Sequence, residues 1–198
     1  ISDRQRFGVA AVQSQAGAEN AMGGIAQANA DNIPILVFVG GNNLAQLSVR
    51  PNFTASQHYQ GWVKSVETIY SPSQVGDVMR RAFHALRNGT PGPVVVELTG
   101  DVCSQDVPEA AQNYQSPKIH RQVPEPDAIE EAAAALIYAE RPMIWAGQGV
   151  MFSGAAAALQ KLSELTAAPV FTTMPGKSAF DERHPLSLGA GSGTTTGP

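Results

Sequence analysis

The sequence has a single cysteine, Cys103, so the chain can form neither an internal disulfide nor a metal site built from several cysteines. It also lacks any apolar run near the ~20 residues that a membrane-spanning helix needs. Neither sign of charge dominates, because 13 basic and 17 acidic side chains leave a net charge of −4. We therefore expect a cytoplasmic protein with no membrane or nucleic-acid partner.

Patterns typical of metal sites and of serine hydrolases are missing as well. No histidine stands at a spacing suggestive of a metal site, and no G-x-S-x-G turn is present to expose a serine. We expect no metal site in the chain. The histidines are interpreted as structural or surface residues: His58, His84, His120 and His184.

What the sequence does contain is a regular alternation of short apolar runs with stretches of helical period. The expected strands are Phe7–Val12, Ile35–Val39, Val94–Leu98, Met143–Ala146 and Val170–Thr172. The expected helices are Glu19–Ala30, Ser73–Arg87, Asp127–Glu140 and Ala155–Thr166. This alternation predicts an α/β fold with parallel sheets flanked by helices.

A polar segment from Asp101 to Pro126 interrupts the alternation and has neither helical nor strand period. Its prolines at 108, 117, 124 and 126 are typical of a linker between domains. The sequence therefore predicts two α/β, Rossmann-like pieces, residues 1–106 and 125–198, joined by a Pro-rich linker at 107–124.

The turn at residues 14–20, Ser-Gln-Ala-Gly-Ala-Glu-Asn, joins the first expected strand to the first expected helix. Gly17 lets the backbone pass close to a neighbouring group, and Asn20 is expected to cap the helix. Such turns lie at the carboxyl edge of a parallel sheet, where α/β proteins bind ligands. Taken alone, these residues are better explained by a simple helix cap, since a turn with one glycine is a weak motif.

The residues that follow this turn extend it into a longer pattern. They are Gly24, Ala26, Ala28, Asp31, Pro34 and Gly40, with the later strand Gly92-Pro93-Val94. Together with the turn, these residues resemble the pyrimidine-binding domain of thiamine-diphosphate-dependent enzymes of the acetolactate synthase type. The resemblance implies that the thiamine side of the cofactor site contains Gln15, Ala16, Gly17, Asn20 and Gln57.

Two positions depart from the family's pattern. The turn reads Gln15-Ala16-Gly17 where the family usually has Gly-Pro-Gly, which alters the approach to the cofactor. Phe53 is followed by Thr54, where the family tends to have a Phe-Gln pair, so Gln57 is the nearest glutamine.

The second piece resembles the first half of the same family's central domain, through Arg141-Pro142, the segment 146–150, Pro169-Val170 and the segment 184–189. The resemblance implies a cleft for FAD, ADP or no nucleotide, with a loop that begins at Gly189. Its expected residues are Gly147, Gln148, Gly149, Val150, Thr173, Met174, Gly176, Lys177 and Gly189. On its own, Gly147-x-Gly149 is a poor dinucleotide fingerprint, because Phe152 replaces the third glycine. Lys177 either contacts a phosphate or is simply solvated.

The resemblance implies an enzyme that makes or breaks carbon–carbon bonds next to the carbonyl of a small 2-oxo acid, with thiamine diphosphate and Mg²⁺. It places the activating glutamate before Ile1 and the segment that holds the diphosphate and its metal after Pro198. We therefore expect a fragment that is inactive alone and works with the remaining domains in a homo-oligomer, a dimer or tetramer. The alternative is a non-catalytic nucleotide-binding or assembly module that keeps the fold.

Overall fold

The computed structural model describes residues 6–120 and 122–192. The chain divides into two compact units, residues 1–120 and 121–198. Each unit contains a parallel sheet with helices packed on it, so the expected α/β fold is confirmed. Within the described residues, no helix is both long and apolar enough to cross a membrane.

The sheet of the first unit has four parallel strands in the order β1-β2-β4-β3. Their bounds are β1 Gly8–Val12, β2 Ile35–Gly40, β3 Ser65–Ile69 and β4 Val94–Leu98. The inner strands β2 and β4 are nearly continuous runs of apolar residues, as expected for strands covered on both faces. β1 and β3 form the two edges.

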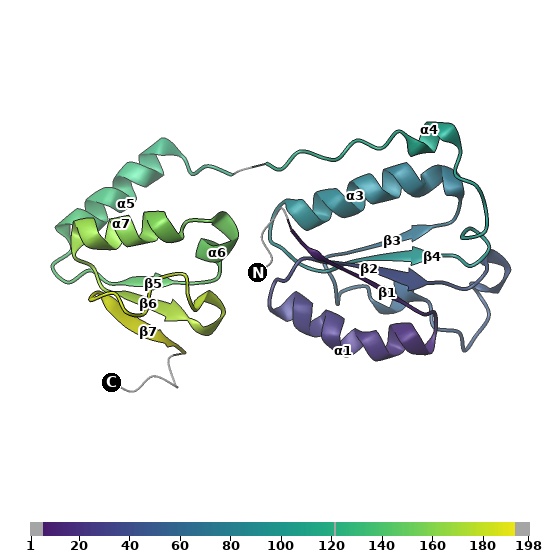
Figure 1. The fold of residues 1–198 in the computed structure, drawn as a ribbon, viewed down its shortest axis with the longest axis horizontal. Helices are drawn as coiled ribbons and strands as arrows, with labels where there is room; N and C mark the ends of the chain where they lie inside the picture. The colour runs from purple at the N-terminus through teal and green to yellow at the C-terminus, as the bar shows by residue number, and fades with distance from the viewer. Residues whose placement is uncertain (1–5, 121, 193–198) are drawn as a thin grey trace. The chain divides into compact units, whose positions relative to one another are not determined.

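Helices α1 (Ala16–Ala30) and α3 (Val75–Arg87) cover opposite faces of this sheet, as Figure 1 shows. Successive residues of β4 point to opposite faces, so Val94 and Val96 pack under α3 while Val95 packs with α1. The short α2 (Ala55–His58) lies on the α1 side and buries Ala55 beside Val95. Two 3₁₀ turns, η1 (Leu44–Gln46) and η2 (Pro72–Gln74), complete the connections.

The first half of the expected linker is packed against the first unit. α4 (Glu109–Gln112) contacts α3, and the ring of Tyr114 lies 5.7 Å from that of Phe83. Beyond α4, the backbone N–H of His120 donates to the side chain of Asn88 at 2.8 Å. The boundary between the two compact units accordingly falls after His120.

The sheet of the second unit has three parallel strands in the order β5-β6-β7, with bounds Ile144–Ala146, Val170–Thr173 and Ser187–Gly191. α7 (Ala156–Thr166) packs on one face through Leu159, which joins Ala146, Val170 and Phe180 in the core. The remaining elements are α5 (Pro126–Tyr138), α6 (Gly149–Ser153) and η3 (Met174–Gly176). Every residue of α5 stays at least partly exposed.

The chain's two tryptophans fall one in each unit. Trp62 lies between α2 and β3 with 52% of its surface exposed, and Trp145 lies on β5 with 62% exposed. Neither indole is therefore a core residue of its unit.

Candidate functional site

Gln15 connects three segments at the carboxyl edge of the first sheet. Its side-chain Oε1 accepts a hydrogen bond from the backbone N–H of Phe53 at 2.9 Å, and its Nε2 donates to Oδ1 of Asn42 at 2.8 Å. Its backbone has φ 57° and ψ −115°, a strained conformation for a residue with a side chain. These contacts hold the turn after β1, the turn after β2 and the segment before α2 in one arrangement.

The N-terminus of α1 differs from the expectation. The helix begins at Ala16 rather than Glu19, so Gln15 takes the N-cap position and Asn20 lies exposed in the second turn. Gln15 makes no side-chain cap, because its amide is directed to Phe53 and Asn42. The expected cap by Asn20 is therefore wrong. The first N–H groups of α1 are left as hydrogen-bond donors at the sheet edge.

Gly17 is required by the fold itself. A Cβ at this position would lie 2.8 Å from the Cβ of Gln13, closer than side-chain carbons pack. The glycine therefore lets α1 start directly after β1, whether or not a ligand approaches the turn.

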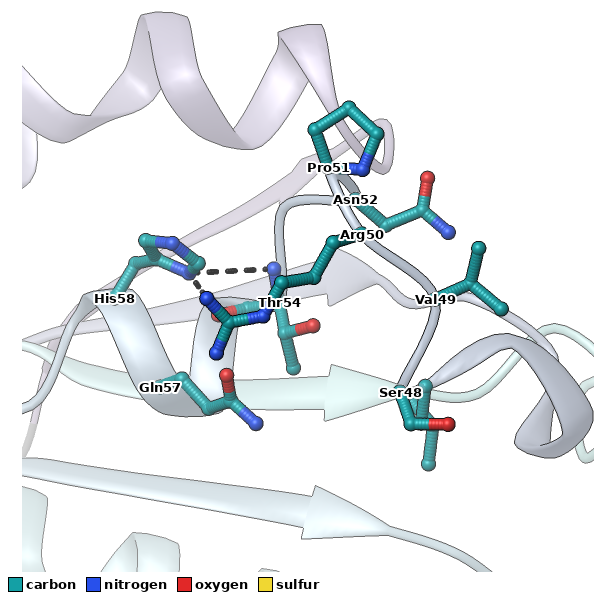
Figure 2. Close-up of a pocket in the computed structure, with 9 residues that line it drawn as sticks. Ser48, Val49, Arg50, Pro51, Asn52, Thr54, Gln57 and His58 are labelled. Atoms are coloured by element: carbon teal, nitrogen blue, oxygen red, sulfur yellow. Dashed lines mark hydrogen bonds between the residues drawn. The ribbon is translucent and has the colours of Figure 1, made fainter.

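A pocket of about 470 Å³ lies between the segment 47–52 and α2 (Figure 2). Gln57 lines it, as does the neighbouring His58, whose Nδ1 lies 2.8 Å from the carbonyl oxygen of Thr54. The His58 ring also stacks on Phe53, with 4.4 Å between the ring centroids. His58 thus belongs to a candidate site, although no motif in the sequence distinguishes it from the other histidines.

Arg50 is a second pocket residue that the sequence analysis missed. Figure 2 shows its side chain extending across the pocket in the direction of His58 and Gln57. The only sequence signal was its position after the second strand, on the edge where the turn at Gly17 also lies. The rest of the lining is polar or small apolar: Leu47, Ser48, Val49, Pro51, Asn52 and Thr54.

Buried polar contacts fix α2, which presents Gln57 and His58. The carboxylate of Glu97, on β4, accepts hydrogen bonds from the backbone N–H groups of Ala55 at 3.1 Å and Ser56 at 3.0 Å. Tyr59, just after α2, is fully buried and donates its hydroxyl hydrogen to the carbonyl of Ala18 in α1. Burial raises the pKa of the Tyr59 phenol above its usual value.

In the second unit, the structure brings together Gly147, Thr173 and Gly176, three of the residues expected around a nucleotide. A Cβ on Gly176 would lie 2.8 Å from the carbonyl carbon of Gly147, so backbone packing alone requires this glycine. The N–H of Gly176 donates to Oγ1 of Thr173 at 3.1 Å. The turn after β5 and the turn after β6 therefore touch directly.

Most of the other expected nucleotide residues directly follow these three in the chain, and α6 contacts η3. Gln148 precedes α6, whereas Gly149 and Val150 lie in its first turn, and Met174 is exposed. Nζ of Lys177 lies 3.9 Å from the carboxylate of Glu182.

Gly189, with φ 80°, lies inside β7 where the pairing with β6 shifts register. The expectation of a loop beginning at Gly189 is therefore wrong. Residues 193–198, which would form a loop after β7, lie outside the described part of the chain. In the described ranges, no three His, Cys, Asp or Glu side chains group as a metal site would require.

Two family models match the chain. Residues 2–67 match the N-terminal TPP binding domain of thiamine pyrophosphate enzymes, and residues 129–197 match the central domain of the same enzymes. TPP is thiamine pyrophosphate, another name for thiamine diphosphate.

Curated relatives match nearly the whole chain. A probable acetolactate synthase large subunit of Methanocaldococcus jannaschii is 35% identical over 196 residues, which cover 92% of this chain and 32% of that protein. A glyoxylate carboligase of Escherichia coli is 36% identical over 82% of the chain and 28% of its own length. A probable 2-ketoarginine decarboxylase of Pseudomonas aeruginosa is 32% identical over 92% of the chain and 33% of its own length.

The chain spans about a third of the length of the curated relatives it matches. The model of the N-terminal domain matches residues of the first structural unit, and the model of the central domain matches residues of the second. The chain belongs to the family of thiamine pyrophosphate enzymes and carries sequence of both their N-terminal and their central domains.

Proposed function

We propose that the chain is part of an enzyme that uses thiamine pyrophosphate to make or break a carbon–carbon bond next to the carbonyl of a small 2-oxo acid. The match of residues 2–67 to a TPP binding domain carries this proposal. The names of the relatives support the reaction class, since they include a synthase of acetolactate, a carboligase and a decarboxylase.

The turn at the start of α1 suits the aminopyrimidine ring of this cofactor. The ring carries nitrogen acceptors, and the backbone N–H groups of Ala16, Gly17 and Ala18 begin a helix that has no side-chain cap. Gln57 adds an exposed amide on the neighbouring α2. When bound, the thiazolium ring supplies the carbanion chemistry, and the protein supplies binding and orientation.

The role that we assign to this chain is positioning. The Gln15 bridge fixes the α1 turn relative to the segment before α2, and Glu97 fixes α2 itself. We propose that the activating glutamate and the residues that bind the diphosphate and Mg²⁺ belong to sequence outside the chain. The chain alone should therefore show no turnover. Its coverage of about a third of each relative supports this division.

In the second unit we propose that FAD or ADP, if the enzyme uses either, contacts the turns at Gly147 and Thr173. These turns end neighbouring parallel strands, the usual place for a ligand in such a sheet. We further propose that the parent enzyme is a homo-oligomer.

The test uses two alanines of α1 that are both exposed, Ala16 in the first turn and Ala30 in the last. In a protein that contains this chain, Ala16→Leu should weaken thiamine pyrophosphate binding about tenfold, measured by calorimetry, and Ala30→Leu should leave it unchanged. Turnover is measured with pyruvate and glyoxylate. Equal affinity in both variants would contradict the proposed turn, and a parent protein without cofactor-dependent turnover would support a non-catalytic module.

A further inference from the structure

The pocket beside α2 has the charge and the hydrogen-bonding groups of a binding site for a small organic anion. We propose that it binds a 2-oxo acid, with the carboxylate of the ligand on the guanidinium of Arg50. The inference rests on the proposed function for the choice of ligand, and its test is independent of the cofactor.

Arg50 differs in its charged surroundings from three other arginines of the chain. Other arginines of the chain form ion pairs with carboxylates: Arg80 with Asp77 at 2.6 Å, Arg81 with Glu67 at 2.7 Å and Arg183 with Asp181 at 2.9 Å. In the described ranges no carboxylate pairs with Arg50, and none lines its pocket. The positive charge of Arg50 therefore faces the pocket uncompensated by protein.

A guanidinium binds a carboxylate through two parallel N–H donors, which also fixes the orientation of the ligand. The neighbouring keto oxygen of a 2-oxo acid is an acceptor and needs a donor beside the guanidinium. Gln57 carries an amide donor, and Figure 2 shows both Gln57 and Arg50 directed into the pocket. Leu47 and Val49 also line the pocket and offer apolar surface to the carbon chain of the acid.

The pocket is also connected to the turn that we assign to the cofactor. Phe53 precedes the pocket residue Thr54, and its backbone N–H donates to the side chain of Gln15 at the start of α1. His58, which lines the pocket, stacks on the Phe53 ring. A 2-oxo acid in this pocket would therefore be held next to the segment that contacts Gln15, the residue just before α1.

The experiment is a titration of the 198-residue chain with pyruvate in the absence of thiamine pyrophosphate. The titration is monitored by ¹H–¹⁵N NMR. Two further ligands separate the contributions: pyruvamide, which is uncharged, and inorganic phosphate. We expect pyruvate to shift the signals of Arg50, Gln57 and His58, and pyruvamide to bind at least about tenfold more weakly.

Three variants test the role of Arg50. Arg50→Gln should raise the Kd for pyruvate about tenfold or more, and Arg50→Lys should restore part of the affinity, because it keeps the charge without the planar fork. Arg80→Gln, on the exposed face of α3, is the matched control and should change nothing. Arg50 is exposed, so its variants should keep the thermal midpoint of the parent chain.

Three results would overturn the proposal: no pyruvate binding, an unchanged Kd in Arg50→Gln, or phosphate binding at the same residues as tightly as pyruvate. Because no cofactor is present, these results are distinct from a failure of the proposed thiamine-dependent function. In the parent enzyme, Arg50→Gln should raise KM for the 2-oxo acid with little change in kcat.

Discussion

The carboxylate of Glu97, in the middle of the first sheet, accepts a hydrogen bond from the backbone N–H of Ser56 at the start of α2, at 3.0 Å. Glu97 is only 1% exposed, and its other oxygen accepts from the N–H of Ala55. A buried carboxylate is costly unless its oxygens are hydrogen-bonded. Here the two N–H groups at the start of a helix satisfy that requirement.

Removing this carboxylate should destabilise the first unit. We expect Glu97→Ala to lower the free energy of unfolding by about 3 kcal/mol, because it leaves two buried N–H groups without an acceptor and creates a cavity. Glu67→Ala is the matched control, since Glu67 pairs with the exposed Arg81 and should cost less than about 1 kcal/mol. Urea unfolding of both variants measures the difference, and equal losses would contradict the role assigned to Glu97.

Two glycines of α1, one in its first turn and one in its middle, should tolerate an added methyl group differently. Gly17→Ala should destabilise the chain by about 1–3 kcal/mol, because the new Cβ would lie 2.8 Å from that of Gln13. Gly24→Ala, in the same helix with open space around it, should stabilise the chain by about 0.5–1 kcal/mol. Thermal unfolding checks both. A neutral Gly17→Ala would show that the turn relaxes and that close packing does not select the glycine.

Tyr59 should make the first unit sensitive to high pH. Burial raises the pKa of its phenol above 10.0, so its contribution to stability is complete below pH 10 and is lost as the pH rises through the raised value. Tyr59→Phe should cost about 1 kcal/mol near neutral pH, because the carbonyl of Ala18 loses its donor. Urea unfolding on both sides of pH 10 tests this, and a variant with the same loss of stability at high pH as the parent would refute it.

In the second unit, Asp181 should stay ionised at a lower pH than an ordinary aspartate. Side-chain and backbone hydrogen bonds from Arg183 lower the pKa of its carboxyl group from 3.8 to about 2. A lowered pKa means that the interaction stabilises the folded unit above pH 3.8 and is lost as the pH falls to about 2. An NMR titration of the Asp181 carboxyl carbon measures the midpoint. Arg183→Gln should move it back toward 3.8, and an unmoved midpoint would assign the shift to another group.

The strands that could be predicted from the sequence are those that read as short apolar runs, including β1, whose residues are mostly exposed. β2 and β4 are covered on both faces, so their residues read as continuous hydrophobic segments. β3 was missed because it is an edge strand with only Ile69 buried, and its polar Glu67 pairs with Arg81. In a single sequence, such a strand looks like a polar loop.

The candidate site was predictable only where it coincided with a motif. The turn at Gly17 was found because a glycine follows an apolar run and opens a longer family pattern. Arg50 and His58 were missed because the segment 41–58 has no helical or strand period. Contacts distant in sequence, Gln15 with Phe53 and Glu97 with Ala55, give that segment its shape.

The placement of one tryptophan in each unit gives the chain two separate optical reporters. Because both indoles are more than half exposed, replacing either with phenylalanine should disturb its unit little. The Trp62→Phe chain would then emit tryptophan fluorescence only from the second unit, and the Trp145→Phe chain only from the first. Unfolding curves from the two single-tryptophan chains would reveal directly whether the units melt together or as independent bodies.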